Sequence, residues 1–149
     1  MKRLLIVTAI IELGVGLALL CFPSATVTFL LGSGLDTPAA VALGRVAGAA
    51  LFALGVACWL AQYDAQSCAA RGLVSAMVLY NLGAVVILGA AGIQSQPVGI
   101  GLWPAVVLHA VMTIWCVRSL LRKPTRINYT TIERDKNHEF DKTHGNLTP

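Results

Sequence analysis

Four long stretches of this chain are rich in apolar residues, and short polar segments separate them. The stretches span residues 4–22, 39–61, 72–93 and 99–121. Because about 20 helical residues cross a hydrocarbon layer about 30 Å thick, each stretch is long enough to span a membrane. The pattern predicts an all-α fold: an integral membrane four-helix bundle in which short connections make successive helices run up, down, up and down.

The composition also favours a membrane protein. Of the 149 residues, 56% are hydrophobic and 12% are charged. Charged residues make up about a quarter of an ordinary soluble domain. Within the four stretches only Glu12, Arg45 and Arg118 carry a formal charge. We therefore assign residues 1–122 to one transmembrane domain.

The two ends of the chain carry different signals. Lys2 and Arg3 precede an apolar run, as in a secretory signal peptide, but Glu12 interrupts the run, so we expect residues 4–22 to remain as the first helix. Residues 123–149 carry charges of both signs and have almost no apolar periodicity. This composition predicts a disordered, solvated tail.

The segment between the first two stretches contains helix start and stop signals. Pro23 disfavours continuation of the first helix, and Thr37 followed by Pro38 is a typical start of the second. Phe29 and Leu30 lie in an apolar run between these signals. The run predicts a short helix along the outer membrane interface.

Basic residues are distributed unevenly about the predicted helices. The connections at 23–38 and 94–98 contain no lysine or arginine, whereas both ends of the chain and Arg71 are basic. The positive-inside rule therefore predicts a multi-pass membrane protein with both termini in the cytoplasm. The net charge of +4 follows from this topology and from the tail, so we expect no nucleic-acid partner.

Each predicted helix holds one polar residue deep in an apolar context: Glu12, Arg45, Asn81 and His109, with Tyr80 beside Asn81. Counting 1.5 Å per residue from the helix ends places the four in one middle-to-outer slab. The axial gap between Glu12 and Arg45 is then about 9 Å, within the combined reach of two long side chains. We predict a buried ion pair, with Asn81 or His109 satisfying the remaining hydrogen bonds.

This polar cluster has a structural and a functional interpretation. A buried ion pair can specify helix packing and register. Ionisable residues in spanning helices are also candidates for a ligand site or a proton path. Gly44 and Gly48 are four residues apart on the helix of Arg45, a spacing that lets helix backbones pack closely.

Metal, redox and catalytic chemistry have few candidates. His109, Met112 and Cys116 share one helix face and form a soft ligand set that suits copper, but Met and Cys are also common packing residues, so we expect no metal site. The chain has four cysteines and no C-x-x-C pair. No nucleotide-binding, hydrolase or zinc-protease motif occurs, so no cofactor or catalytic residue is indicated and an enzyme is not expected.

Several of these features resemble a known family. The glutamate of the first helix, the P-x6-LLG run from Pro23 to Gly32 and the segment LGRVAGAALFALGVACW at 43–59 resemble the DoxX-like group of small four-helix bacterial membrane proteins. The resemblance covers roughly residues 4–122 and implies a location in the bacterial inner membrane. The group's namesake is similar to a membrane subunit of a thiosulfate:quinone oxidoreductase, which implies a quinone-facing or respiratory accessory role. Glu12 and Arg45 are the positions that the resemblance carries over.

Three functions are compatible with the sequence. The first is a non-enzymatic accessory or assembly subunit that docks a membrane protein partner or a second copy through small-residue faces. The second is a binding module for a quinone-like or other small amphipathic molecule, with Arg45, His109, Asn81 or Tyr80 addressing its polar head. The third is proton-coupled transport through Glu12 and His109. A pocket that opens to the membrane would favour the second function, and a cluster closed by side chains would oppose it.

Overall fold

The computed structural model describes residues 1–94 and 98–122, and its regular elements in these two ranges are all helical. They are α1 (Lys2–Cys21), α2 (Pro23–Leu31), α3 (Pro38–Ala61), η1 (Gln62–Asp64), α4 (Cys68–Gln94) and α5 (Leu102–Leu121). This confirms the predicted all-α class for the described residues. Helices α1, α3, α4 and α5 are long and apolar enough to cross a membrane. The predicted disordered tail, 123–149, lies outside the described residues.

Local sequence signals explain where α2 and α3 end and begin. The short helix expected between the first two stretches is present as α2, with Pro23 in its first turn. Gly32 ends it with a left-handed φ of 79°, a conformation that glycine adopts without a Cβ penalty. At the start of α3, the Thr37 side chain accepts a hydrogen bond from the Ala40 N–H at 3.1 Å. The Thr37 cap is the role that the sequence predicts, whereas the Gly32 cap was not predicted.

Helix α4 begins earlier than the sequence pattern predicts. It starts at Cys68 rather than near residue 72. The Ser67 hydroxyl accepts a hydrogen bond from the Ala70 N–H at 3.1 Å and so satisfies one of the free donors of the first turn. The charged Arg71 interrupts the apolar run at this point, so hydrophobicity alone placed the start of the helix after it.

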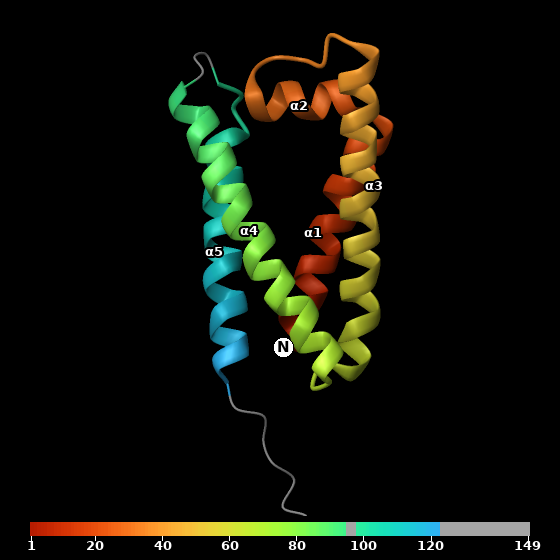
Figure 1. The fold of residues 1–149 in the computed structure, drawn as a ribbon, viewed down its shortest axis with the longest axis vertical. Coiled ribbons are helices and arrows are strands. Elements are labelled where there is room, and N and C mark those ends of the chain that lie inside the picture. Colours follow the sequence, from red (N-terminus) through yellow and green to blue (C-terminus); the bar gives the residue numbers. More distant parts are fainter. Residues whose placement is uncertain (95–97, 123–149) are drawn as a thin grey trace, which may run out of the picture.

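The long helices form two pairs, α1 with α3 and α4 with α5, and α2 lies across one end of the molecule (Figure 1). Glycines allow α1 and α3 to approach closely. A Cβ added to Gly48 would lie 2.8 Å from the Leu20 backbone nitrogen and 2.9 Å from the Gly16 oxygen. A Cβ added to Gly55 would lie 2.8 Å from the Leu13 nitrogen. The close packing predicted for Gly48 is therefore an intrachain contact with α1.

The hydrophobic core lies at the end of the molecule opposite α2. Its buried residues come from all four long helices and are Leu4, Leu5, Ala9, Cys58, Val74, Met77, Met112 and Cys116. Nearer α2 the two helix pairs stand apart (Figure 1). The core therefore joins the pairs at one end and leaves the space beneath α2 for the site described next.

The outward surfaces of the long helices are strongly apolar. Leu43, Ile93 and Leu121 are each at least 70% exposed. Soluble monomers rarely expose contiguous apolar surface on this scale. Such a surface suits a molecule surrounded by lipid tails, in agreement with the four membrane-length helices.

Candidate functional site

A cavity of about 920 Å³ lies between the two helix pairs and beneath α2. All five α-helices contribute to its lining. Among the described residues that line it, the polar side chains are Glu12, Thr26, Tyr80 and His109, and the others are apolar or glycine. Small-molecule sites in proteins typically enclose about 300–1,000 Å³ and combine apolar walls with a few polar groups. The cavity has the size and lining of such a site.

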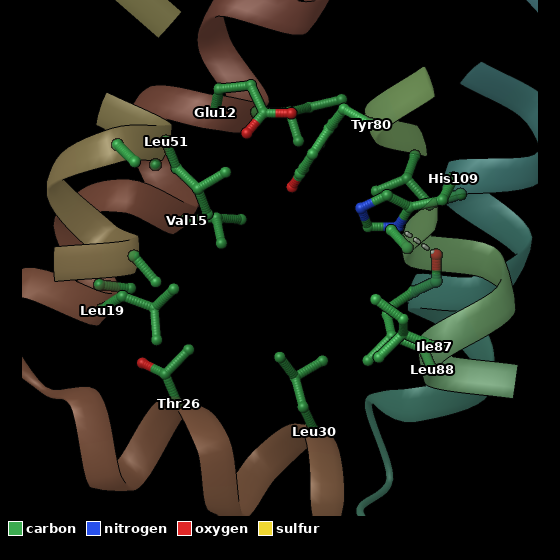
Figure 2. Close-up of a pocket in the computed structure, with 18 of the residues that line it drawn as sticks. Glu12, Val15, Leu19, Thr26, Leu30, Leu51, Tyr80, Ile87, Leu88 and His109 are labelled. Atoms are coloured by element: carbon green, nitrogen blue, oxygen red, sulfur yellow. Dashed lines mark hydrogen bonds between the residues drawn. The ribbon is translucent and has the colours of Figure 1, made fainter. Parts of the chain in front are cut away.

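The polar side chains are segregated along the cavity. Figure 2 shows Glu12 of α1, Tyr80 of α4 and His109 of α5 at one end, and Thr26 of α2 at the other. Along α1, the lining runs from Glu12 to Leu19, a rise of about 10 Å. The apolar part is therefore long enough to take a short hydrocarbon chain, with a polar head at the Glu12 end.

The rings of His109 and Tyr80 contact each other at the polar end of the cavity. Their centroids are 5.8 Å apart and their planes meet at 61°, an edge-to-face arrangement. His109 Nδ1 lies 2.7 Å from the Ala105 carbonyl oxygen. Because a carbonyl oxygen only accepts, Nδ1 is the donor, and in the neutral ring Nε2 remains an acceptor.

Glu12 is buried but its carboxyl group has no partner in the described part of the chain. The residue is 5% exposed, yet it makes no hydrogen bond or ion pair within residues 1–94 and 98–122. No buried side-chain oxygen or nitrogen described there is both fully enclosed and unpaired. The carboxyl oxygens therefore border open space. Since an unpaired polar group in an apolar setting costs free energy, this position favours a polar ligand group.

Asn81 belongs to the same region but borders a second, much smaller space. This space of about 10 Å³ is lined in part by Thr8, Glu12, Asn81 and His109, and it is about large enough for one water molecule. The Asn81 Nδ2 donates to the Met77 carbonyl oxygen at 2.8 Å. The structure thus brings together four of the five residues of the predicted polar cluster, across two adjoining spaces.

Arg45 is the exception, and the predicted Glu12–Arg45 ion pair is not formed. Arg45 is exposed on α3 and lines neither of these spaces. Within the described ranges it has no ion-pair partner. Arg45 therefore cannot neutralise Glu12 or orient a ligand in this cavity, and this corrects the interpretation drawn from the sequence.

The register between α1 and α3 explains the error. Gly48 packs against residues 16–20 of α1, and Gly55 packs against residues 9–13. In this register Glu12 lies level with residue 54 and Arg45 level with residue 21, the last of α1. From 45 to 54 the rise is about 14 Å, beyond the gap expected from the helix ends. The end of α1 and the start of α3 are not at the same height, because α2 and the loop after it lie between them.

The other singled-out residues contribute to packing. Gly44 faces α2 and the following loop, where an added Cβ would lie 3.2 Å from Pro23 Cβ. Met112 is 5% exposed and Cys116 is 1% exposed, and both belong to the hydrophobic core. Within the described residues no group of three His, Cys, Asp or Glu side chains is placed to hold a metal.

The sequence did not predict that one face of α4 forms a wall of the cavity. Tyr80, Gly83, Ala84 and Ile87 all line the cavity and recur at the spacing of one helix face. The two small residues leave space beside the polar Tyr80. A search for a polar side chain followed by small residues one turn later on the same face would have identified this wall.

Comparison with protein-family models, with curated proteins and with solved structures finds no match for this chain. The resemblance to the DoxX-like group therefore stays a prediction.

Proposed function

We propose that this protein spans the membrane four times and binds a small uncharged amphipathic molecule in the cavity beneath α2. One observation supports this most directly: the unpaired carboxyl group of Glu12 and the hydroxyl group of Tyr80 sit at one end of an otherwise apolar cavity of about 920 Å³. The proposed orientation keeps both chain termini in the cytoplasm, because lysine and arginine gather at that end of the helices.

The side chains at the polar end define the head group of the ligand. The carboxyl oxygens of Glu12 and His109 Nε2 accept hydrogen bonds, and the Tyr80 hydroxyl both donates and accepts. No lysine or arginine is among the described lining residues, so an anionic head would find no counter-ion. An uncharged head with hydroxyl or carbonyl groups fits best, and a quinone or quinol is one example.

The exposed lining indicates how such a ligand enters. Leu79 and Ile87 line the cavity and are 73% and 70% exposed. These α4 residues belong to the apolar surface that faces lipid in the proposed orientation. The ligand would therefore enter sideways from the bilayer, without crossing the aqueous phase.

The other two functions remain predictions, and the structure weakens one basis of the accessory-subunit hypothesis. Gly48, one of the two glycines predicted to let helices pack closely, is buried against α1, as is Gly55. They are therefore not available to a partner. Proton-coupled transport would use Glu12 and His109, which border the same cavity.

Filling the cavity tests the proposal. Ala84→Trp places an indole in the cavity, whereas Val86→Trp places one on the outer face of the same helix, where Val86 is 62% exposed and outside the lining. Native mass spectrometry after gentle extraction should detect a small apolar molecule with the wild type and Val86→Trp, and not with Ala84→Trp. If all three proteins carry the same molecule, the cavity is not its binding site.

A second substitution tests the polar end. Removing the Tyr80 hydroxyl by Tyr80→Phe deletes one hydrogen bond to the ligand, worth about 1 kcal/mol, or about fivefold in affinity. Tyr63→Phe is the matched control, because Tyr63 is 75% exposed and outside the cavity. Decylubiquinone is a suitable quinone probe, and its dissociation constant for each protein is the measurement. Equal affinities for the two variants would contradict the assigned head position.

A further inference from the structure

A separate groove lies on α5, at the end of the molecule away from α2. It encloses about 410 Å³ and is lined by Val111, Ile114, Trp115, Arg118, Ser119 and Arg122. These positions recur every three or four residues and so form one continuous helix face. Among the residues that the structure describes, none lines both this groove and the cavity beneath α2.

One end of this groove is cationic. Arg118 and Arg122 are exposed, lie one helical turn apart and have no carboxylate partner within the described ranges. Nearby, Arg71 Nη2 donates to the Leu120 carbonyl oxygen at 3.2 Å and adds a positive charge at the end of α5. The planar guanidinium group binds phosphate oxygens with two parallel hydrogen bonds, so paired arginines suit a phosphate group.

The other end of the groove is apolar. Val111 and Ile114 are 53% and 60% exposed, and Trp115 is 38% exposed. From Val111 to Leu121, the last residue of α5, the helix rises about 15 Å, and Arg122 follows directly. Tryptophan is enriched where the head-group region meets the hydrocarbon layer, and here it stands between the arginines and the aliphatic residues. The groove therefore changes from cationic to apolar along the axis of α5.

We propose that this groove binds an anionic phospholipid, with its phosphate on Arg118 and Arg122 and an acyl chain against Val111, Ile114 and Trp115. The cationic end and the aliphatic end match the two parts of such a lipid in order and in chemistry. Basic residues at the membrane surface attract anionic lipids, and the attraction falls off within a Debye length. The proposal is independent of the ligand in the cavity, whose described lining residues include no lysine or arginine.

Lipid titration of the full-length protein in detergent tests the groove. Native mass spectrometry measures the affinity for phosphatidylglycerol and for phosphatidylcholine of matched chain length. The wild type should prefer phosphatidylglycerol, and each of Arg118→Gln and Arg122→Gln should weaken its binding about fivefold. Phosphatidylcholine binding should change less than twofold. If the Arg118→Gln, Arg122→Gln double variant does not fold, Arg118→Lys and Arg122→Lys replace it. These variants retain the charge and should retain most of the preference for phosphatidylglycerol.

Arg45→Gln is the matched control, because Arg45 is exposed and lies on another helix, at the level of the last residue of α1. It should keep the wild-type preference for phosphatidylglycerol. An unchanged preference in the Arg118→Gln, Arg122→Gln double variant, or an equal loss in Arg45→Gln, would overturn the assigned site. Competition by soluble glycerol phosphate at the same concentrations as the lipid would overturn the role given to the acyl chain.

Discussion

At the residue scale, Gly48 shows how one missing side chain positions two helices. Its neighbours across the α1–α3 contact are backbone atoms of Gly16 and Leu20, which cannot rotate away as a flexible side chain does. Small residues allow this approach in membranes, where association depends on close packing because lipid tails are as apolar as the helices. The register that this contact fixes also places Glu12 at the cavity.

Gly48→Ala should therefore destabilise the fold. The added methyl group overlaps backbone atoms of α1, and overpacking of this kind typically costs about 1–3 kcal/mol. Gly72→Ala is the control, because a Cβ there meets nothing within 4 Å and alanine favours helix, so its stability should rise by up to about 1 kcal/mol. Unfolding free energies in matched micelles measure both. Equal changes would contradict the close α1–α3 contact.

Arg45 illustrates how position along a helix decides the cost of a charge. It lies level with Cys21, the last residue of α1, so a snorkelling side chain can bring its guanidinium group to the membrane interface. A charge that reaches the interface costs far less than one at the bilayer centre. An arginine in an apolar stretch therefore does not require a buried partner.

At the element scale, α2 forms the roof of the cavity and is held by the segment that leads into α5. The Gly101 N–H donates to the Phe29 carbonyl oxygen at 2.9 Å. A Cβ at Gly99 would overlap backbone atoms of Phe29 and Leu30. The backbone of this segment thus packs directly on α2, and glycine is required at the contact because any side chain would displace one of the two.

Gly99→Ala should loosen this roof. In a background without Cys21 and Cys68, the labelling rate of Leu30→Cys by a membrane-soluble maleimide reports exposure of the cavity-facing side of α2. We expect the rate to rise severalfold with Gly99→Ala. It should stay unchanged with Gly89→Ala, where an added Cβ meets nothing within 4 Å. An unchanged rate in both variants would show that the contact does not hold α2.

At the scale of the whole molecule, the core and the cavity occupy opposite ends because the two helix pairs converge at one end only (Figure 1). Converged helices bury large apolar side chains such as Leu5 and Met77 and supply the packing. Separated helices leave space, and lipid-facing residues border it. The same arrangement therefore gives the described helices a closely packed end and an open end that holds the cavity.

Two native cysteines test the proposed orientation. Cys21 ends α1 beside α2, and Cys68 begins α4 at the opposite end; both are exposed and free. In variants that retain one of the two, a membrane-impermeant maleimide should label Cys21 in intact cells and Cys68 only after the cytoplasmic side is opened. Because Cys58 and Cys116 are buried, they should react little with the maleimide and add little background labelling. The reverse labelling pattern would invert the orientation.

The sequence by itself determined the class of the fold and its principal elements. Long apolar runs, Pro23 and the Thr37 cap are local signals, and each acts through neighbours in the chain, so α2 and the membrane-length helices follow from them. The sequence also identified Glu12, Tyr80, Asn81 and His109, because a polar residue in an apolar run is conspicuous without a structure.

Only the tertiary structure decided which of these residues meet. Helix register depends on contacts such as that of Gly48 with α1, and a shift of a few residues moves a side chain by several ångströms, enough to make or break an ion pair. That register separates Arg45 from Glu12. The cavity depends likewise on the divergence of two helix pairs beneath α2, a property of nonlocal packing that no single stretch of sequence encodes.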